Sequence, residues 1–399
     1  MSKLPSRPEP AVPAALDGSA VASLRRLNGS KVLQALRAEP SRRFTVREVA
    51  TSTGLSRPTV ARLLEDLVEA GHVLAVEGRP GGPGGTGSAG RPARRFWFNR
   101  WGGLVVSVDL GATSSAVMIT DLVGTELHFS HQIGVALPTT EAALEDIVPR
   151  IDAALTAVRG GQSGRREALP VAALSVSAPV LTQPDGTIGN AFVVVRDWCG
   201  GNLLAPLRRR YGNAPGVAAN DLVLAAEAEM RFGALTHARH ALFVCLSGYS
   251  AAVLVHDGRI HEGHGHPAGD IGSLPRYRWP DAIARAREAV WGGQERLPFV
   301  QDIIDRAAAG DPIAEAAVGG VGQALAPGVA DLAVLWDPDT VVLTGQFVEA
   351  GRTFLDPLEE EIRRAIPSGL RLVTSTVDRN KGSCLGGVVR ALDAIDWSL

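Results

Sequence analysis

Short polar and basic side chains are concentrated at the beginning of one predicted helix, between residues 56 and 62. They are Ser56, Arg57, Thr59 and Arg62, with Pro58 among them. Hydroxyl and guanidinium groups at the N-terminal end of a helix can hydrogen-bond base edges and phosphates when that helix enters a major groove. These residue types and their spacing therefore predict contacts with double-stranded DNA.

The elements that must position these side chains are two short helices joined by a tight turn, over residues 45–71. Thr45 and Glu48 have the spacing of a capping box at the first helix, and Thr45 is also a candidate DNA contact. Gly54 permits the turn, and Ser56 can cap the second helix. The inward face of the second helix is apolar, at Val60, Leu63, Leu64 and Leu67. The pattern predicts a helix-turn-helix, although many helix pairs of this size serve folding alone.

Two segments with strand-like alternation follow, at residues 72–77 and 94–99, and they enclose a Gly- and Pro-rich tip at residues 78–93. Together with an amphipathic helix at residues 29–38, they complete a winged helix-turn-helix domain over residues 19–100. Gly-Arg-Pro occurs twice in the tip, and Arg91 is the candidate for insertion into a minor groove. A flexible, solvated tip explains the glycines equally well.

The distribution of charge supports a nucleic-acid partner for this domain. Residues 1–100 contain 16 Lys and Arg against 8 Asp and Glu, whereas the remainder contains 24 against 34. The formal net charge of −2 therefore hides a basic N-terminal part, which suits contacts with phosphates.

Length and composition fit a chain of 399 residues with two or three globular domains. Residues 1–18 are rich in Pro and Ala, which predicts a disordered tail. Cys199, Cys245 and Cys384 are too widely spaced for a disulfide framework or a zinc site, and they fit a reducing cytoplasm. No apolar run has transmembrane length in this reading, so no membrane partner is expected.

From residue 101 onward, strands and helices alternate. Strands are predicted at residues 103–109, 116–120, 125–130, 171–176 and 217–219, with a helix at 141–158 among them. A helix at 222–232 and strands at 241–246 and 251–256 begin a second set. Two antiparallel hairpins, each continued by helices and strands, predict a duplicated α/β domain with a cleft between its lobes, residues 101–216 and 217–399.

Several motifs of this region occur together in one known family. They are Asp109-Leu110-Gly111-Ala112-Thr113, Asn220-Asp221, Asp257-Gly258-Arg259, Ala268-Gly269-Asp270-Ile271-Gly272 and Thr344-Gly345. With them, nearly the whole chain resembles the ROK family of repressors, open reading frames and sugar kinases. The resemblance implies a two-lobed, actin-like sugar-kinase fold. The winged helix-turn-helix implies one of the family's transcription factors.

The resemblance also shows where the chain departs from the family's kinases. Those enzymes hold ATP with a Gly-Thr-Gly-hydrophobic-Gly loop, and only glycine lets the backbone approach the phosphates so closely. This chain has residues 247–251, Ser-Gly-Tyr-Ser-Ala, at that place, and Tyr249 obstructs a phosphate cradle. Asp221 matches the family's catalytic base and becomes vestigial without ATP. We therefore expect no enzymatic activity and no cofactor.

The sugar site implied by the resemblance is altered as well. Asp270 stands where the family has a Glu, Ser273 replaces a His, and Val194 replaces an Asn. Each lost polar partner would leave a sugar hydroxyl unpaired, at about 1–3 kcal/mol. A standard hexose is therefore expected to bind poorly. The residues expected to line the cleft are Asn220, Asp221, Asp270 and His266.

The cluster His261, His264 and His266 suggests metal binding, but closely spaced histidines of a loop are usually solvated. The zinc motif of the ROK family is rich in cysteine, and the corresponding residues 274–291 of this chain contain none. We therefore expect no bound metal.

These features favour a DNA-binding transcriptional repressor of carbohydrate metabolism in the cytoplasm. A homodimer or homotetramer would bind an operator, and a carbohydrate-like effector in the cleft would change the affinity. One alternative is an ATP-dependent sugar kinase with an added DNA-binding domain. Another is a regulator whose C-terminal part only oligomerises and binds no metabolite.

Overall fold

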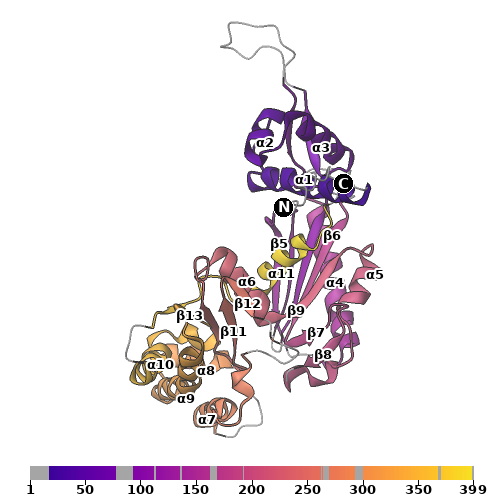
Figure 1. The fold of residues 1–399 in the computed structure, drawn as a ribbon. Helices are drawn as coiled ribbons and strands as arrows, with labels where there is room; N and C mark the ends of the chain where they lie inside the picture. The colour runs from indigo at the N-terminus through magenta and orange to yellow at the C-terminus, as the bar shows by residue number, and fades with distance from the viewer. Residues whose placement is uncertain are drawn as a thin grey trace, which may run out of the picture. The chain divides into compact units, whose positions relative to one another are not determined.

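The structure is a computed structural model, which divides into two compact units: Met1–Gly102 together with Asp396–Leu399, and Gly103–Ile395 (Figure 1). It describes residues 18–77, 93–111, 114–134, 137–161, 169–191, 193–261, 263, 269–292, 300–366 and 370–397. The predicted tail lies outside these residues except for Gly18, and the predicted wing tip lies outside them except for residue 93.

The first unit has the order of elements that the sequence predicts. Its helices are α1 (Gly18–Ala38), α2 (Val46–Thr53) and α3 (Arg57–Glu69), and its strands are β1 (Val73–Val76) and β2 (Arg95–Phe98). The strands pair antiparallel, with Val73 opposite Phe98 and Val76 opposite Arg95. The predicted apolar face of α3 is buried at Val60, Leu63, Leu64 and Leu67. A winged helix-turn-helix is therefore present.

Helix α1 begins 11 residues earlier than its apolar pattern predicts, at Gly18 and not at residue 29. The apolar pattern did not predict this extension, because the leucines in it do not form a buried face. Leu24 is 50% exposed and Leu27 is 56% exposed. Helix α3 ends at Glu69, and Gly71 follows it with a positive φ of 78°, close to the predicted end.

The C-terminal end of the chain belongs to the first unit, which the sequence analysis did not foresee. The ring of Trp397 meets the ring of Phe98 edge-on, with centroids 5.8 Å apart, and that of His72 at 5.3 Å. The guanidinium of Arg37 lies 4.8 Å from the centroid of Trp397. Aromatic and cation–π contacts of this kind fasten the end of the chain to α1 and the hairpin.

The second unit contains two five-stranded sheets of identical connectivity, as the predicted duplication requires. The first has the order β5-β4-β3-β6-β9 and the second β12-β11-β10-β13-β14. In each, three antiparallel strands are followed by two strands that join in parallel. The strands are β3 (Leu104–Leu110), β4 (Ser114–Thr120), β5 (Glu126–Ile133), β6 (Val171–Ala178), β9 (Gly216–Asn220), β10 (Ala241–Cys245), β11 (Ala251–His256), β12 (Arg259–His261), β13 (Thr340–Thr344) and β14 (Leu372–Thr374).

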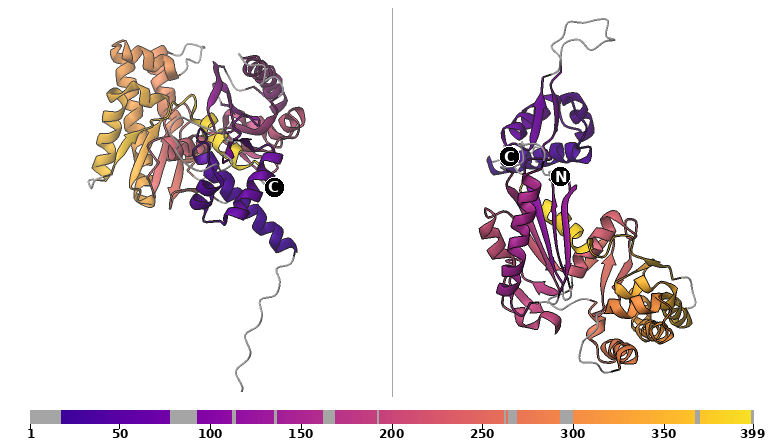
Figure 2. Two further views of the ribbon diagram at one scale, coloured as in Figure 1. Left: turned by 90° about the horizontal axis from the view of Figure 1, so that it is seen from above. Right: turned by 180° about the vertical axis from the view of Figure 1, so that it is seen from behind.

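Helices cover the sheets of this unit (Figure 2). They are α4 (Thr140–Arg159), α5 (Leu204–Arg210), α6 (Asp221–Phe232), α7 (Trp279–Trp291), α8 (Val300–Ala308), α9 (Pro312–Trp336), α10 (Arg352–Ala365) and α11 (Gly382–Asp393). A small hairpin, β7 (Val180–Thr182) and β8 (Ile188–Ala191), and three 3₁₀ helices, Val193–Trp198, Ile271–Ser273 and Gln346–Ala350, complete the described elements. The structure thus has the predicted mixed α/β architecture.

The last helix, α11, packs against α6 and against β3 and β6 of the first sheet. Strand β9, which begins at Gly216, is also part of the first sheet. The predicted lobe boundary between residues 216 and 217 remains a prediction, but segments that follow it, β9 and α11, return to the first sheet. Sequence order alone does not show such returns of the chain.

Helix α9 is long and apolar enough, by length and composition, to cross a membrane. Here the expectation that no run reaches that length was wrong. Half of its apolar window is buried inside the second unit, where Val318, Val321 and Leu325 belong to the hydrophobic core. A buried core helix meets the same criteria of length and hydropathy.

Candidate DNA interface and ligand cavity

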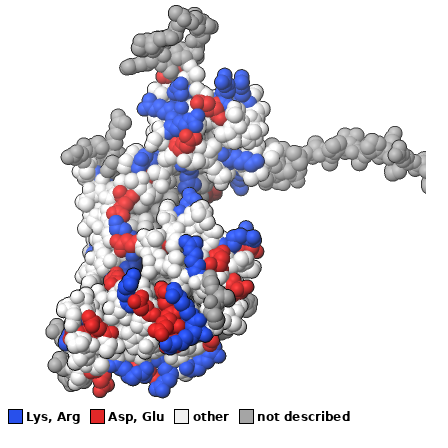
Figure 3. All heavy atoms as spheres, turned by 90° about the vertical axis from the view of Figure 1, so that its left-hand side faces the viewer, with Lys and Arg blue, Asp and Glu red and all other residues white. Residues whose placement is uncertain are grey.

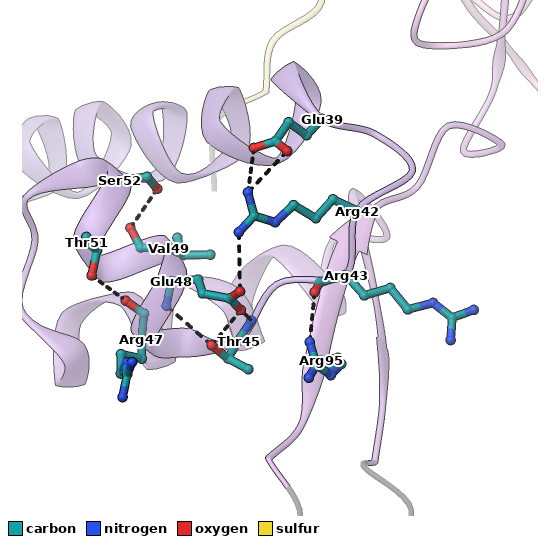
Figure 4. Close-up of polar contacts among 10 residues, drawn as sticks. All are labelled: Glu39, Arg42, Arg43, Thr45, Arg47, Glu48, Val49, Thr51, Ser52 and Arg95. Carbon is teal, nitrogen blue, oxygen red and sulfur yellow. Dashed lines mark hydrogen bonds and ion pairs between the residues drawn. The ribbon is translucent and has the colours of Figure 1, made fainter. Parts of the chain in front are cut away.

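The two helices of the DNA-binding motif begin as the sequence predicts, with side-chain caps. The Thr45 hydroxyl accepts a hydrogen bond from the Glu48 amide at 3.3 Å, and the Glu48 carboxylate accepts one from the Thr45 amide at 2.7 Å (Figure 4). The hydrogen bonds that the Glu48 carboxylate accepts from the Thr45 amide and hydroxyl lower the pKa of Glu48 to about 2. The Thr45 hydroxyl also donates to Glu48 at 2.8 Å, so the capping box already engages this side chain.

Helix α3 presents two arginines that have no acidic partner among the described residues. Arg57 and Arg62 are exposed, whereas two of the three acidic residues of the same helix are paired: Glu65 with Arg94, and Asp66 with Arg25. Pairing reduces the negative charge that would repel phosphates from this helix. The positive charge of α3 is therefore concentrated where the sequence predicts contact with DNA.

The hydroxyls of Ser56 and Thr59 are hydrogen-bonded to each other at 2.8 Å, and Ser56 also accepts from the Thr59 amide at 3.3 Å. Pro58 occupies the first turn of α3, as expected. Each hydroxyl keeps capacity for a further bond, because a hydroxyl has one donor and two acceptor positions. The roles of Ser56, Pro58 and Thr59 in DNA contact stay predictions, and Arg91 lies outside the described residues.

Three further arginines that the sequence analysis did not select lie on the same unit: Arg43, Arg47 and Arg95. All three are exposed (Figure 4). Arg43 lies 4.9 Å from the ring centroid of Trp97, and Arg95 donates to the Arg43 carbonyl at 3.2 Å. In the space-filling view, Lys and Arg side chains gather over this unit (Figure 3). The signal in the sequence was the pair Arg42-Arg43, of which Arg42 is used internally, by Glu39 and Glu48.

The second unit contains a cavity of about 810 Å³, within the range of small-molecule sites. Asn220, Asp221 and Asp270 line it, as predicted, and Asp109 joins them. His266 lies outside the described residues. The sequence thus located three of the side chains that surround this space, although their roles as ligand contacts stay predictions.

Two partly buried carboxyl groups, those of Asp109 and Asp221, line this cavity and interact electrostatically. Asp109 accepts a hydrogen bond from the Ser177 hydroxyl at 2.6 Å, and burial raises its pKa to about 6. Burial also raises the pKa of Asp221, to about 7, and the nearby Asp109 contributes to that rise. Asn220 caps α6 through its side-chain oxygen Oδ1, which accepts hydrogen bonds from the backbone amides of Leu222 and Val223.

The raised pKa of Asp221 predicts a pH-dependent stability. In the unfolded chain the group titrates near its ordinary value of 3.8, so the folded state loses stability as the pH rises from about 4 through about 7. Asp221→Asn removes this penalty while keeping an oxygen for the Leu222 amide. Its melting temperature should exceed that of the native chain at pH 8 by more than at pH 4. Asp356→Asn, at an exposed site on α10, is the control. An equal difference at both pH values would contradict the assignment.

Hydrogen bonds within the loop at residues 247–251 and to Asp270 hold this loop. The Tyr249 hydroxyl donates to Asp270, and the Ser247 amide donates to the Ser250 hydroxyl at 3.2 Å. Burial and Asp270 raise the pKa of the Tyr249 phenol well above its ordinary value. The pairing of a predicted ligand residue with this tyrosine could not be read from the sequence, where the two lie 21 positions apart.

Metal binding finds no support within the described parts of the chain, where no group of three His, Cys, Asp or Glu side chains is placed to hold an ion. His264 and His266 lie outside those parts, and His261 lies at the cavity wall. Cys199, Cys245 and Cys384 are free thiols.

Comparison with known families matches both units. Residues 27–75 match the IclR helix-turn-helix domain, and residues 281–389 match the ROK family. Among solved structures, a ROK family transcriptional regulator homologous to the Escherichia coli Mlc protein aligns with a TM-score of 0.66 and 18% identity, covering 94% of this chain and 97% of that one. The ROK family glucokinase of Streptomyces griseus aligns with a TM-score of 0.56 and 23% identity, covering 73% and 100%.

Two groups of curated proteins are similar in sequence. The glucokinase of Streptomyces coelicolor is 25% identical over 73% of this chain and 97% of its own length. The DNA-binding transcriptional dual regulator NagC of Escherichia coli is 24% identical over 83% of this chain and 84% of its own. The chain joins a ROK family domain to a helix-turn-helix domain. It is a DNA-binding transcriptional regulator.

Proposed function

We propose that this regulator is a repressor whose ROK domain senses a small polar ligand and does not catalyse phosphate transfer. The DNA-binding part of this proposal rests on Arg57 and Arg62. Both are exposed on α3, whose N-terminus is capped, and neither has an acidic partner among the described residues. Arg43, Arg47 and Arg95 add positive charge that suits phosphates. The repressor assignment draws support from a relative whose curated name is N-acetylglucosamine repressor.

The proposed mechanism couples the cavity to the operator by a shift between conformations. Two or more copies of the chain, as a homodimer or homotetramer, would present their α3 helices to related half-sites. A carbohydrate-like ligand held near Asn220, Asp221 and Asp270 would favour one closure of the ROK domain. The ligand could then change the DNA affinity by no more than its own preference for one of the two closures.

The absence of kinase activity is argued from the loop at residues 247–251. Tyr249 lies in this loop and donates a hydrogen bond to Asp270, so a phenol side chain stands where kinases of the family have glycine. We also place the protein in the cytoplasm, where the free thiols stay reduced.

A sugar kinase with an added DNA-binding domain is the second candidate. It is favoured by the glucokinase relatives and by the retention of Asp109 and Asp221 in the cavity. The two candidates differ in whether the chain consumes ATP.

One preparation of the full chain separates these functions. We expect it to retain fragments of the source genome in a salt-dependent manner and to leave ATP unconsumed in the presence of glucose. Added salt should weaken retention because phosphate contacts release counterions. ATP-dependent phosphorylation of glucose would overturn the proposed loss of catalysis. Failure to retain any fragment at low salt would overturn the proposed repressor.

A further inference from the structure

The last helix, α11, begins at the wall of the cavity in the second unit. Gly382 and Ser383 line the cavity, and the side chain of Ser383 is hydrogen-bonded to the carboxyl group of Asp109. Ser383 is buried, and Asp109 belongs to β3. A molecule that bound Asp109 would share its oxygens with Ser383. The first turn of α11 is therefore fastened to a group that an occupant of the cavity would contact.

Helix α11 is also packed directly against the backbone of α6, whose first residue is the cavity residue Asp221. A Cβ atom on Gly386 would lie 1.8 Å from the carbonyl oxygen of Leu224, so no side chain separates the two helices there. Glu227 of α6 and Arg390 of α11 form an ion pair between the same helices. Closely packed elements transmit a displacement because no gap absorbs it. A shift of α6 at the cavity should therefore move α11.

The chain reaches the DNA-binding unit within a few residues of the end of α11. Asp396–Leu399 belong to that unit, and only three residues, 394–396, separate Asp393 from Trp397. A connection of this length spans at most about 14 Å when it is fully extended. It therefore has little slack with which to absorb a displacement of α11.

Trp397 contacts both strands' ends where the hairpin of the first unit meets α1. Its ring lies edge-on to His72, which precedes β1, and to Phe98, the last residue of β2. The guanidinium of Arg37, near the end of α1, lies over the same ring. Aromatic and cation–π contacts stabilise such an arrangement beyond the area that they bury. Trp397 is thus placed to orient the hairpin that carries the exposed Arg95.

We propose that residues 382–397 couple the cavity to the DNA-binding unit, with Ser383 at the cavity end and Trp397 as the positioning residue for the hairpin of β1 and β2. This rests on the proposed function, because it supplies the route by which a ligand in the cavity changes DNA affinity. Coupling free energies are reciprocal, so a change at either end alters the other. Without Trp397, DNA affinity should fall in proportion to the fraction of chains whose hairpin keeps its position.

Hydrogen exchange of the full chain without DNA, followed by mass spectrometry, tests the coupling. Trp397→Ala should raise the exchange rates of the amides at residues 73–76 and 95–98 by about 10-fold, a typical effect of losing aromatic and cation–π contacts. Trp397→Phe keeps a ring and should restore most of the protection. Phe232→Ala, which removes an exposed ring from the second unit, is the control and should leave both strands unchanged.

A double-mutant cycle tests the connection to the cavity. Ser383→Ala should change the exchange rates of the same two strands by about threefold or more, within the usual range for residues that couple two sites. In the Trp397→Ala chain this effect should disappear, because the connection is already broken. An equal effect of Ser383→Ala with and without Trp397, or no effect in either chain, would overturn the proposal.

The same variants are compared for affinity to a genomic fragment that the native chain retains. Trp397→Ala should bind the fragment about 10-fold more weakly, and Trp397→Phe should bind within about threefold of the native chain. Native exchange rates in the hairpin of Trp397→Ala, or native DNA affinity of that variant, would overturn the proposal. If the native chain retains no fragment, the repressor assignment fails instead, and the exchange measurements still decide the coupling because they are made without DNA.

Discussion

Replacing Arg57 and Arg62 together by alanine should weaken binding of the full chain to its operator by about 100-fold or more, since each arginine contact with a base or phosphate contributes about 1–3 kcal/mol. Both side chains are exposed and have no acidic partner among the described residues, so their removal should leave the fold intact. Fluorescence anisotropy with a retained fragment measures the loss, and thermal unfolding checks the fold.

The matched control is the double variant Arg209→Ala and Arg285→Ala. These arginines are exposed on α5 and α7 of the second unit, so the control removes the same formal charge from the chain. It should bind DNA within about threefold of the native chain, because neither side chain belongs to the unit that we propose contacts DNA. Equal losses in the two double variants would assign the effect to net charge and would remove the special role of α3.

Gly386→Ala should lower the free energy of unfolding of the second unit by about 3 kcal/mol, at the upper end of the usual effect of overpacking. A Cβ atom at Gly386 would lie 1.8 Å from the carbonyl oxygen of Leu224, a backbone atom of α6. Helices α11 and α6 would have to separate, and α11 also packs on β3 and β6. Urea denaturation followed by circular dichroism measures the change.

Gly320→Ala provides the comparison within the same unit. Gly320 lies in α9, and nothing lies within 4 Å of the position of an added Cβ. Alanine is favoured over glycine inside a helix by about 0.5–1 kcal/mol, so this variant should be neutral or slightly more stable. A Gly386→Ala chain that unfolds at the same urea concentration as Gly320→Ala would show that α11 and α6 do not approach so closely.

The sequence predicted the parts of the fold that depend on local chemistry. Thr45, Gly54 and Ser56 act where they do because caps and turns are set by a few adjacent residues. The duplicated sheets were predicted from two antiparallel hairpins, each continued by helices and strands. The early start of α1 was hidden because Leu24 and Leu27 are about half exposed and give no apolar face.

Contacts between distant segments could not be predicted in the same way. Trp397 packs on His72 and Phe98, and no local pattern near the end of the chain indicates that partner. Arg287 reads as one of several charges on an amphipathic helix until the fold brings it beside Gly248. Asn220 and Asp221 were identified through the resemblance to the ROK family, because a family's motifs indicate which distant segments meet in the fold.

The central claim is that α3 directs this protein to particular DNA sites, and genome-wide mapping of bound DNA tests it most directly. The native chain should occupy a small set of discrete sites with two related half-sites, and the Arg57→Ala and Arg62→Ala chain, at equal abundance, should lose them. Occupancy of the same sites by both chains, or the absence of discrete sites with the native chain, would contradict the account.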